Sequence, residues 1–100
     1  MIISHGTLST PPEHADAARA LLRGVAQASR QDTGCVLYIV SEDLERPGHF
    51  VITERWASLA DMHAHLALPG VGEAVAAAHG LGATDLTITA YEGGQATTIM

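Results

Sequence analysis

Apolar and polar residues recur along this chain with the periods of strands and helices. Residues 2–8 form a short strand-like segment, although Gly6 weakens it. Thr10 and Glu13 flank two prolines and together predict a capped helix start. The apolar positions that follow are spaced by three or four residues: Ala15, Ala18, Leu21, Leu22, Val25 and Ala26. This stripe predicts an amphipathic helix that ends before Gly34.

The second half of the chain predicts a hairpin, two helical segments and a last strand. Residues 35–40 and 49–56 are β-branched and aromatic, and a charged loop with Pro47 and Gly48 joins them. Ser58-Leu59-Ala60-Asp61 predicts a helix start, and Pro69-Gly70 separates that helix from an Ala-rich segment over residues 71–79. In residues 86–91, apolar Leu86, Ile88 and Ala90 alternate with polar or aromatic neighbours, which is typical of a half-buried strand.

The order β-α-β-β-α(α)-β is that of a ferredoxin-like split βαβ fold, an α+β class with helices on one face of an antiparallel sheet. We expect one domain over residues 1–100, with a core at 2–92 and a C-terminal tail at 93–100. The 35–40 strand is apolar on both parities, so both faces of the sheet carry apolar side chains. Covering the second face with another copy is the simplest solution, which predicts a homodimer.

Composition narrows the classes of partner. The net charge is −6 and only 5 residues are Lys or Arg, so we expect no nucleic-acid partner and no anionic membrane surface. The N-terminus lacks the features of a signal peptide, no uncharged apolar stretch reaches the roughly 18 residues of a membrane span, and we expect a cytoplasmic protein. The single cysteine, Cys35, excludes an internal disulfide. His63 and His65 point about 200° apart on a helix, so we expect no metal site.

The run Gly34-Cys35-Val36-Leu37-Tyr38, followed by Phe50, by Glu54-Arg55-Trp56, and by His65 ahead of Pro69, resembles the antibiotic biosynthesis monooxygenase domains. The resemblance covers nearly the whole chain. It implies a dimeric α/β barrel in which two sheets pack face to face, with a pocket between sheet and helices in each subunit. Characterised members oxygenate phenolic or quinol substrates with O₂ and without metal or flavin, which implies no cofactor. Other members degrade haem, and some are isomerases or have no known activity.

Five residues are candidates for the site. His65 matches the family histidine that faces the pocket, although it also lies one helical turn after Asp61, with which it could form a surface ion pair. His5 and Tyr38 are candidate catalytic donors, and Tyr38 could instead fill the barrel. His63 lies on the apolar stripe of its helix and is a candidate for substrate binding. Trp56 is either an aromatic wall of the pocket or a core anchor.

The leading hypothesis is a cofactor-independent monooxygenase that oxidises a hydroxylated aromatic or quinol, with His65 as the base or as a group that orients the substrate. Its partner would be a small aromatic or quinone-like substrate. A non-catalytic ligand-binding or interaction module of the same fold remains an alternative, as do an isomerase and a haem-degrading enzyme. The last would use an Asn-Trp-His set, whereas His5, His65 and Val75 stand near those positions here.

Overall fold

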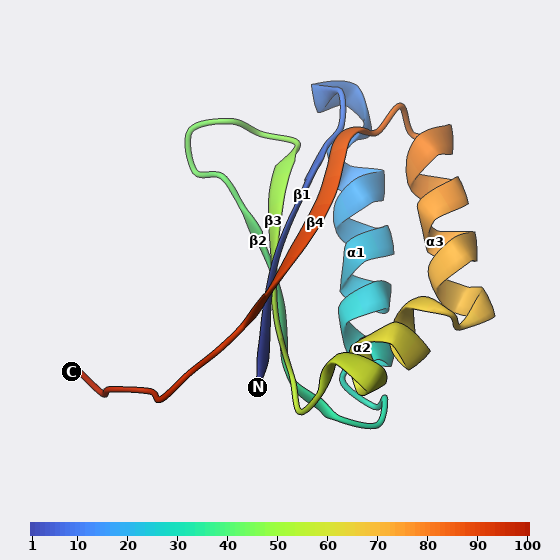
Figure 1. Cartoon of the computed structure of the whole chain (residues 1–100). Coiled ribbons are helices and arrows are strands. Elements are labelled where there is room, and N and C mark those ends of the chain that lie inside the picture. Colours follow the sequence, from blue (N-terminus) through green and yellow to red (C-terminus); the bar gives the residue numbers. More distant parts are fainter.

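The computed structural model describes all 100 residues, and its elements follow the predicted order (Figure 1). The strands and helices are β1 (Ile2–Ser9), the short 3₁₀ helix η1 (Pro12–His14), α1 (Ala15–Ser29), β2 (Cys35–Glu42), β3 (His49–Trp56), α2 (Leu59–Leu66), α3 (Pro69–Gly80) and β4 (Thr84–Glu92). The last eight residues, 93–100, form neither helix nor strand. None of the helices combines the length and the hydrophobicity that a membrane-spanning helix requires.

The four strands form one antiparallel sheet in the order β2-β3-β1-β4, so β1 and β3 are inner strands and β2 and β4 are edges. In Figure 1 the helices all lie on one side of the sheet, and the C-terminal residues extend away from the body on the other side. The predicted α+β, ferredoxin-like fold is therefore confirmed.

The core lies between the sheet and α1. The predicted helical stripe is confirmed, since Ala18, Leu22 and Ala26 of α1 are buried against the sheet. On the sheet side, β3 presents three large buried side chains on one parity, namely Phe50, Ile52 and Trp56. Burying such side chains is the main source of stability in a domain of this size.

The two helix starts differ in how well the sequence predicts them. Ser58 caps α2 as expected, because its Oγ accepts a hydrogen bond from the Asp61 backbone N–H at 3.1 Å. The cap predicted at Thr10 is wrong: its hydroxyl donates to the Gly48 carbonyl at 3.3 Å, and α1 begins at Ala15 without a side-chain cap. The Thr10 side chain therefore ties the end of β1 to the hairpin loop instead.

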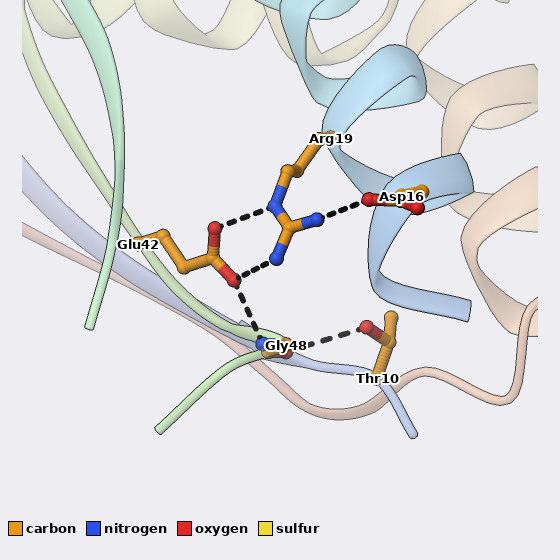
Figure 2. A network of polar contacts seen from close by, with 5 residues as sticks. All are labelled: Thr10, Asp16, Arg19, Glu42 and Gly48. Atoms are coloured by element: carbon orange, nitrogen blue, oxygen red, sulfur yellow. Dashed lines mark hydrogen bonds and ion pairs between the residues drawn. The ribbon is translucent and has the colours of Figure 1, made fainter. Parts of the chain in front are cut away.

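A polar network joins α1 to the β2–β3 hairpin near Thr10 (Figure 2). Arg19 binds the Glu42 carboxylate through two hydrogen bonds: its Nε donates to Oε1 at 2.6 Å and its Nη2 donates to Oε2 at 2.8 Å. Arg19 also forms an ion pair with Asp16. The backbone N–H of Gly48 donates to Glu42 Oε2 at 2.9 Å. The hydrogen bond from Arg19, with that from Gly48, lowers the pKa of Glu42 to about 2. Paired forks of this kind fix geometry as well as charge, so the network holds the hairpin against the helix.

The other face of the sheet, here called the open face, has no helix over it. Residues of alternate parity point there: Ile3, His5, Thr7, Leu37, Ile39, Ser41, His49, Val51, Thr53, Arg55, Thr87, Thr89 and Tyr91. Ile3 and Ile39 are each 43% exposed and Tyr91 is 60% exposed. The prediction of a second apolar face is confirmed, whereas the prediction of a half-buried last strand is wrong for the isolated chain. Ile88 of β4 is 46% exposed although it faces the helix side of the sheet, because it borders the unfilled space between the sheet and the helices.

Candidate functional site

A cavity of about 650 Å³ lies between the sheet and helices α1 and α3. Its walls are mostly apolar: Leu21 and Val25 come from α1, Val71 and Ala74 from α3, and Ile52 from the sheet. A concave, largely apolar space of this size is typical of a site for a small organic molecule.

Ionisable side chains reach this cavity from separate elements. Asp32 comes from the loop after α1, Tyr38 from β2, Glu54 from β3 and His65 from α2, while Glu73 reaches it from α3. None of the lining residues is Arg or Lys. The cavity therefore combines a long apolar surface with acidic groups, one phenol and one imidazole.

His65 is held by Asp32. The Nδ1 atom of His65 lies 2.6 Å from Asp32 Oδ2, and the imidazole is only 5% exposed. A carboxylate accepts but does not donate, so Nδ1 carries the proton and donates it to Asp32. No protein group bonds to Nε2, and no buried side-chain nitrogen or oxygen lacks a partner, so Nε2 borders the cavity. Its lone pair is available to a molecule bound there.

The sequence suggested Asp61 as the partner of His65, and this pairing is absent from the structure. Gly34 explains how Asp32 takes its place. It adopts a φ of +79°, and a Cβ at this position would overlap the Asp61 carboxylate. The loop after α1 therefore passes close to α2 only because residue 34 is glycine, and this approach brings Asp32 to His65. Nothing in the local pattern around Asp32 signals this meeting, since the two residues are separated by 33 positions.

Trp56 packs against the imidazole ring of His65. It is fully buried, and its ring centroid lies 4.6 Å from that of His65 with the planes tilted by 32°. Its Nε1 donates to Glu54 Oε1 at 3.0 Å, and Ser4 Oγ donates to Glu54 Oε2 at 3.4 Å. Both carboxylate oxygens of Glu54 therefore accept a hydrogen bond, although the residue is buried. Trp56 does not itself line the cavity, so it is a core anchor that fixes His65 rather than a wall of the cavity.

Tyr38 lies at the edge of this cluster, with its ring centroid 6.0 Å from that of His65. Burial raises the pKa of Tyr38 to about 12, and the negative charge of Glu54 adds to this shift while the Ser29 hydroxyl opposes it. The phenol thus keeps its proton across the physiological range, and its O–H can donate a hydrogen bond to a bound molecule.

Two of the candidate histidines lie elsewhere. His5 points to the open face, on the side of the sheet opposite the cavity, so its placement in the pocket is wrong. His63 is exposed on α2 and does not line the cavity. Its predicted packing on an apolar stripe is wrong because α2 turns Met62 and His65 inward instead. The structure therefore brings together His65 and Tyr38 from the predicted set, and adds Asp32.

Comparisons with known proteins agree with this architecture. The sequence model of a family described as antibiotic biosynthesis monooxygenase matches residues 1–77. A crystal structure of a candidate antibiotic biosynthesis monooxygenase from Deinococcus radiodurans is 61% identical, with a TM-score of 0.97 over 100% of this chain and 99% of that chain. A similarly described protein from Chloroflexus aurantiacus is 30% identical, with a TM-score of 0.76 over 99% of this chain and 98% of that one. A search of curated protein sequences finds no match.

Proposed function

This chain belongs to the antibiotic biosynthesis monooxygenase family, and from that membership we propose that it oxygenates an uncharged hydroxylated aromatic or quinol with O₂. The single observation that carries the proposal is the Asp32–His65 pair, whose unbonded Nε2 borders an apolar cavity. A histidine held in one tautomer by a carboxylate is suited to abstract a proton from a bound substrate.

In the proposed reaction, His65 Nε2 accepts the phenolic proton, and Asp32 stabilises the imidazolium that forms. The electron-rich phenolate then supplies the electrons that reduce O₂. For a phenol with a ring C–H para to the hydroxyl, one oxygen atom enters the ring as a carbonyl and the other leaves as water. Phenol plus O₂ thus gives quinone plus water, which balances all atoms and electrons without another reductant.

Tyr38 is the candidate donor to the oxygen anion of the substrate. Because its phenol stays protonated, with a pKa raised by burial to about 12, it offers a hydrogen bond rather than accepting a proton. Such a donor, fixed in a water-poor site, stabilises charge that develops during the reaction. The apolar walls also exclude water from a reactive intermediate.

The charge of the lining favours a neutral substrate. Asp32, Glu54 and Glu73 line the cavity and no Arg or Lys does, so a phosphate or carboxylate on the ligand would find no cationic partner there. The haem-degrading alternative receives no support from this lining, because haem carries two propionate groups. An isomerase would also use the Asp32–His65 pair as a base, but it would consume no O₂.

We also propose that the protein is a homodimer, in which the open faces of two copies cover each other. Its exposed apolar side chains, Ile3, Ile39 and Tyr91 among them, support this arrangement, since an apolar sheet face without helices favours a partner. In that arrangement each cavity stays on the outer side of the sheet, between sheet and helices.

Oxygen uptake tests the proposed reaction. We expect uptake with some members of a panel of neutral phenols, naphthols and quinols, and none with His65→Ala. His63→Ala is the matched control, because it removes an exposed histidine from the same helix and should leave the rate unchanged. Uptake that is equal in wild type and His65→Ala would contradict the role of His65. Ligand binding without any uptake across the panel would favour the non-catalytic module.

A further inference from the structure

The open face carries one ionisable group at its centre. His5 is the fourth of the eight residues of β1, and β1 is an inner strand, so any partner that covers the face covers His5. The side chain is exposed in the single chain. This position is remote from the chemistry proposed above, because the cavity lies on the other side of the sheet.

The surroundings of His5 contain no negative charge. On β3 it lies opposite Thr53 and diagonal to Arg55, and on β4 it lies opposite Thr89 and diagonal to Tyr91. The more distant β2 adds only Leu37, Ile39 and Ser41 to this face. The amino group of Met1 lies at the end of the same strand. His49, at the start of β3, also has the parity of this face, and its Nδ1 lies 2.8 Å from Ser9 Oγ. The ionisable groups nearer to His5 are therefore Arg55, Tyr91 and the amino group of Met1, and none of them is a carboxylate.

The acidic residues are placed elsewhere, although the chain has 11 of them and a net charge of −6. Among strand residues, Glu54 is buried on the cavity side, Glu42 turns toward Arg19 of α1, and Glu92 pairs with the inward-facing Ile2. Asp85 lies at the irregular start of β4, next to its bulge with β1. Two copies can thus bring their open faces together without carboxylate repulsion, but also without a carboxylate that could pair with a charged His5.

We propose that the open face is a self-association surface whose strength depends on the protonation state of His5. This inference rests on the dimer proposed above and adds proton linkage to it. Covering His5 with a second copy removes water from the imidazole, and burial disfavours the charged form. A second copy related by a two-fold axis brings only more of the same groups. The dimer therefore holds neutral His5, and protonation favours the free copies.

The size of the effect follows from linkage. Histidine is the side chain whose charge ordinarily changes between about pH 5 and pH 8. Each proton that must be released when a complex forms can change its dissociation constant by up to about tenfold per pH unit. Two imidazoles must release their protons for one dimer to form. The dissociation constant should therefore rise about 100-fold between about pH 8 and about pH 5.5.

Sedimentation equilibrium on the full chain, at constant ionic strength and at these two pH values, tests the proposal. We expect the rise of about 100-fold in wild type. His5→Gln keeps a neutral polar side chain and should stay dimeric at both pH values. His5→Arg carries a permanent charge and should be monomeric even at about pH 8, with unchanged far-ultraviolet circular dichroism. The matched control is His14→Gln, at an exposed position before α1, which should keep the wild-type pH dependence.

The outcomes separate this inference from the dimer itself. A dimer whose dissociation constant does not change with pH would overturn the proton linkage and leave the dimer intact. A rise of the same size in His5→Gln would assign the linkage to another group and also overturn the proposal. A dimeric, folded His5→Arg would show that the interface lies elsewhere. A chain that is monomeric at both pH values would refute both the dimer and its linkage.

Discussion

Asp32→Asn tests whether the carboxylate holds His65 in the tautomer needed for a base. The substitution keeps the size of the side chain but removes the charge, and the amide it introduces can donate to Nδ1 where the carboxylate can only accept. The new amide should therefore favour a proton on Nε2, the atom that faces the cavity. A base with its proton already in place cannot accept another from the substrate.

The magnitude follows from the contact at 2.6 Å between His65 Nδ1 and Asp32 Oδ2. Loss of correct orientation and of the charge that stabilises an imidazolium costs a catalytic base roughly 10²–10⁴ in rate, or about 2.7–5.4 kcal/mol at about 1.36 kcal/mol per decade. The effect on folding is smaller, because Asp32 retains 25% side-chain exposure. Loss of one charge-assisted bond at such a site costs about 1–2 kcal/mol, which is about 4–16 °C in melting temperature for a chain of this size.

Two measurements check this prediction. Oxygen uptake with the best substrate of the panel gives kcat/KM, and ¹⁵N NMR of the imidazole nitrogens gives the tautomer without any substrate. We expect wild type to carry the proton on Nδ1, and Asp32→Asn to show it on Nε2. Asp61→Asn is the matched control, since Asp61 lies one turn before His65 and makes no bond to it. Unchanged kcat/KM together with an unchanged tautomer in Asp32→Asn would refute the reasoning.

Three further predictions concern other parts of the molecule. The pKa of Glu42 in the folded state is lowered from 4.5 to about 2. Its contribution to the free energy of unfolding is therefore complete above pH 4.5 and is lost as the pH falls toward 2. Urea titrations should show a smaller loss of stability over this window in Glu42→Gln than in wild type. Tyr38→Phe should stay folded but lose about 100- to 1000-fold in kcat. In wild type the stability contributed by neutral Tyr38 should fall between pH 10 and about 12, as measured by chemical denaturation. Gly34→Ala, which combines a φ of +79° with overlap on Asp61, should cost more than about 2 kcal/mol in thermal unfolding. Gly24→Ala in α1, where a Cβ would meet no atom within 4 Å, should be neutral or stabilising.

Elements with local signals were predictable from the sequence, and contacts between distant segments were not. The stripe of α1 and the Ser58 cap each rest on residues within one or two turns, so both could be read directly. The face of the sheet on which His5 lies could not be predicted from the sequence. Ile2 and Ile3 are both apolar, so the pattern does not show which alternate residues of β1 point toward the helices. Gly6 settles it in the structure: it faces inward, where a Cβ would lie 2.9 Å from the Thr87 carbonyl.

The site shows the same division. His65 and Tyr38 were found through motif residues that belong to regular elements. Asp32 was missed because it lies in a loop, and only the close passage of that loop along α2 gives it a role. His63 was misplaced because an eight-residue helix offers little periodicity. Leu59 and Leu66 are 47% and 38% exposed while Met62 is buried, so apolar side chains lie on more than one side of α2 and do not mark its buried face.

The cavity and the open face of the sheet take their residues from the same strands. In β1, Ser4 donates to the Glu54 carboxylate on the cavity side, while the next residue, His5, points to the open face. In β3, Glu54 and Trp56 support His65, while Arg55 between them faces outward. Since successive strand residues alternate sides, the chemistry and the association surface share a backbone but no side chain. A change on the open face can therefore alter assembly while the Asp32–His65 pair stays in place, and oxygen uptake by a monomeric His5→Arg would show how far catalysis depends on the dimer.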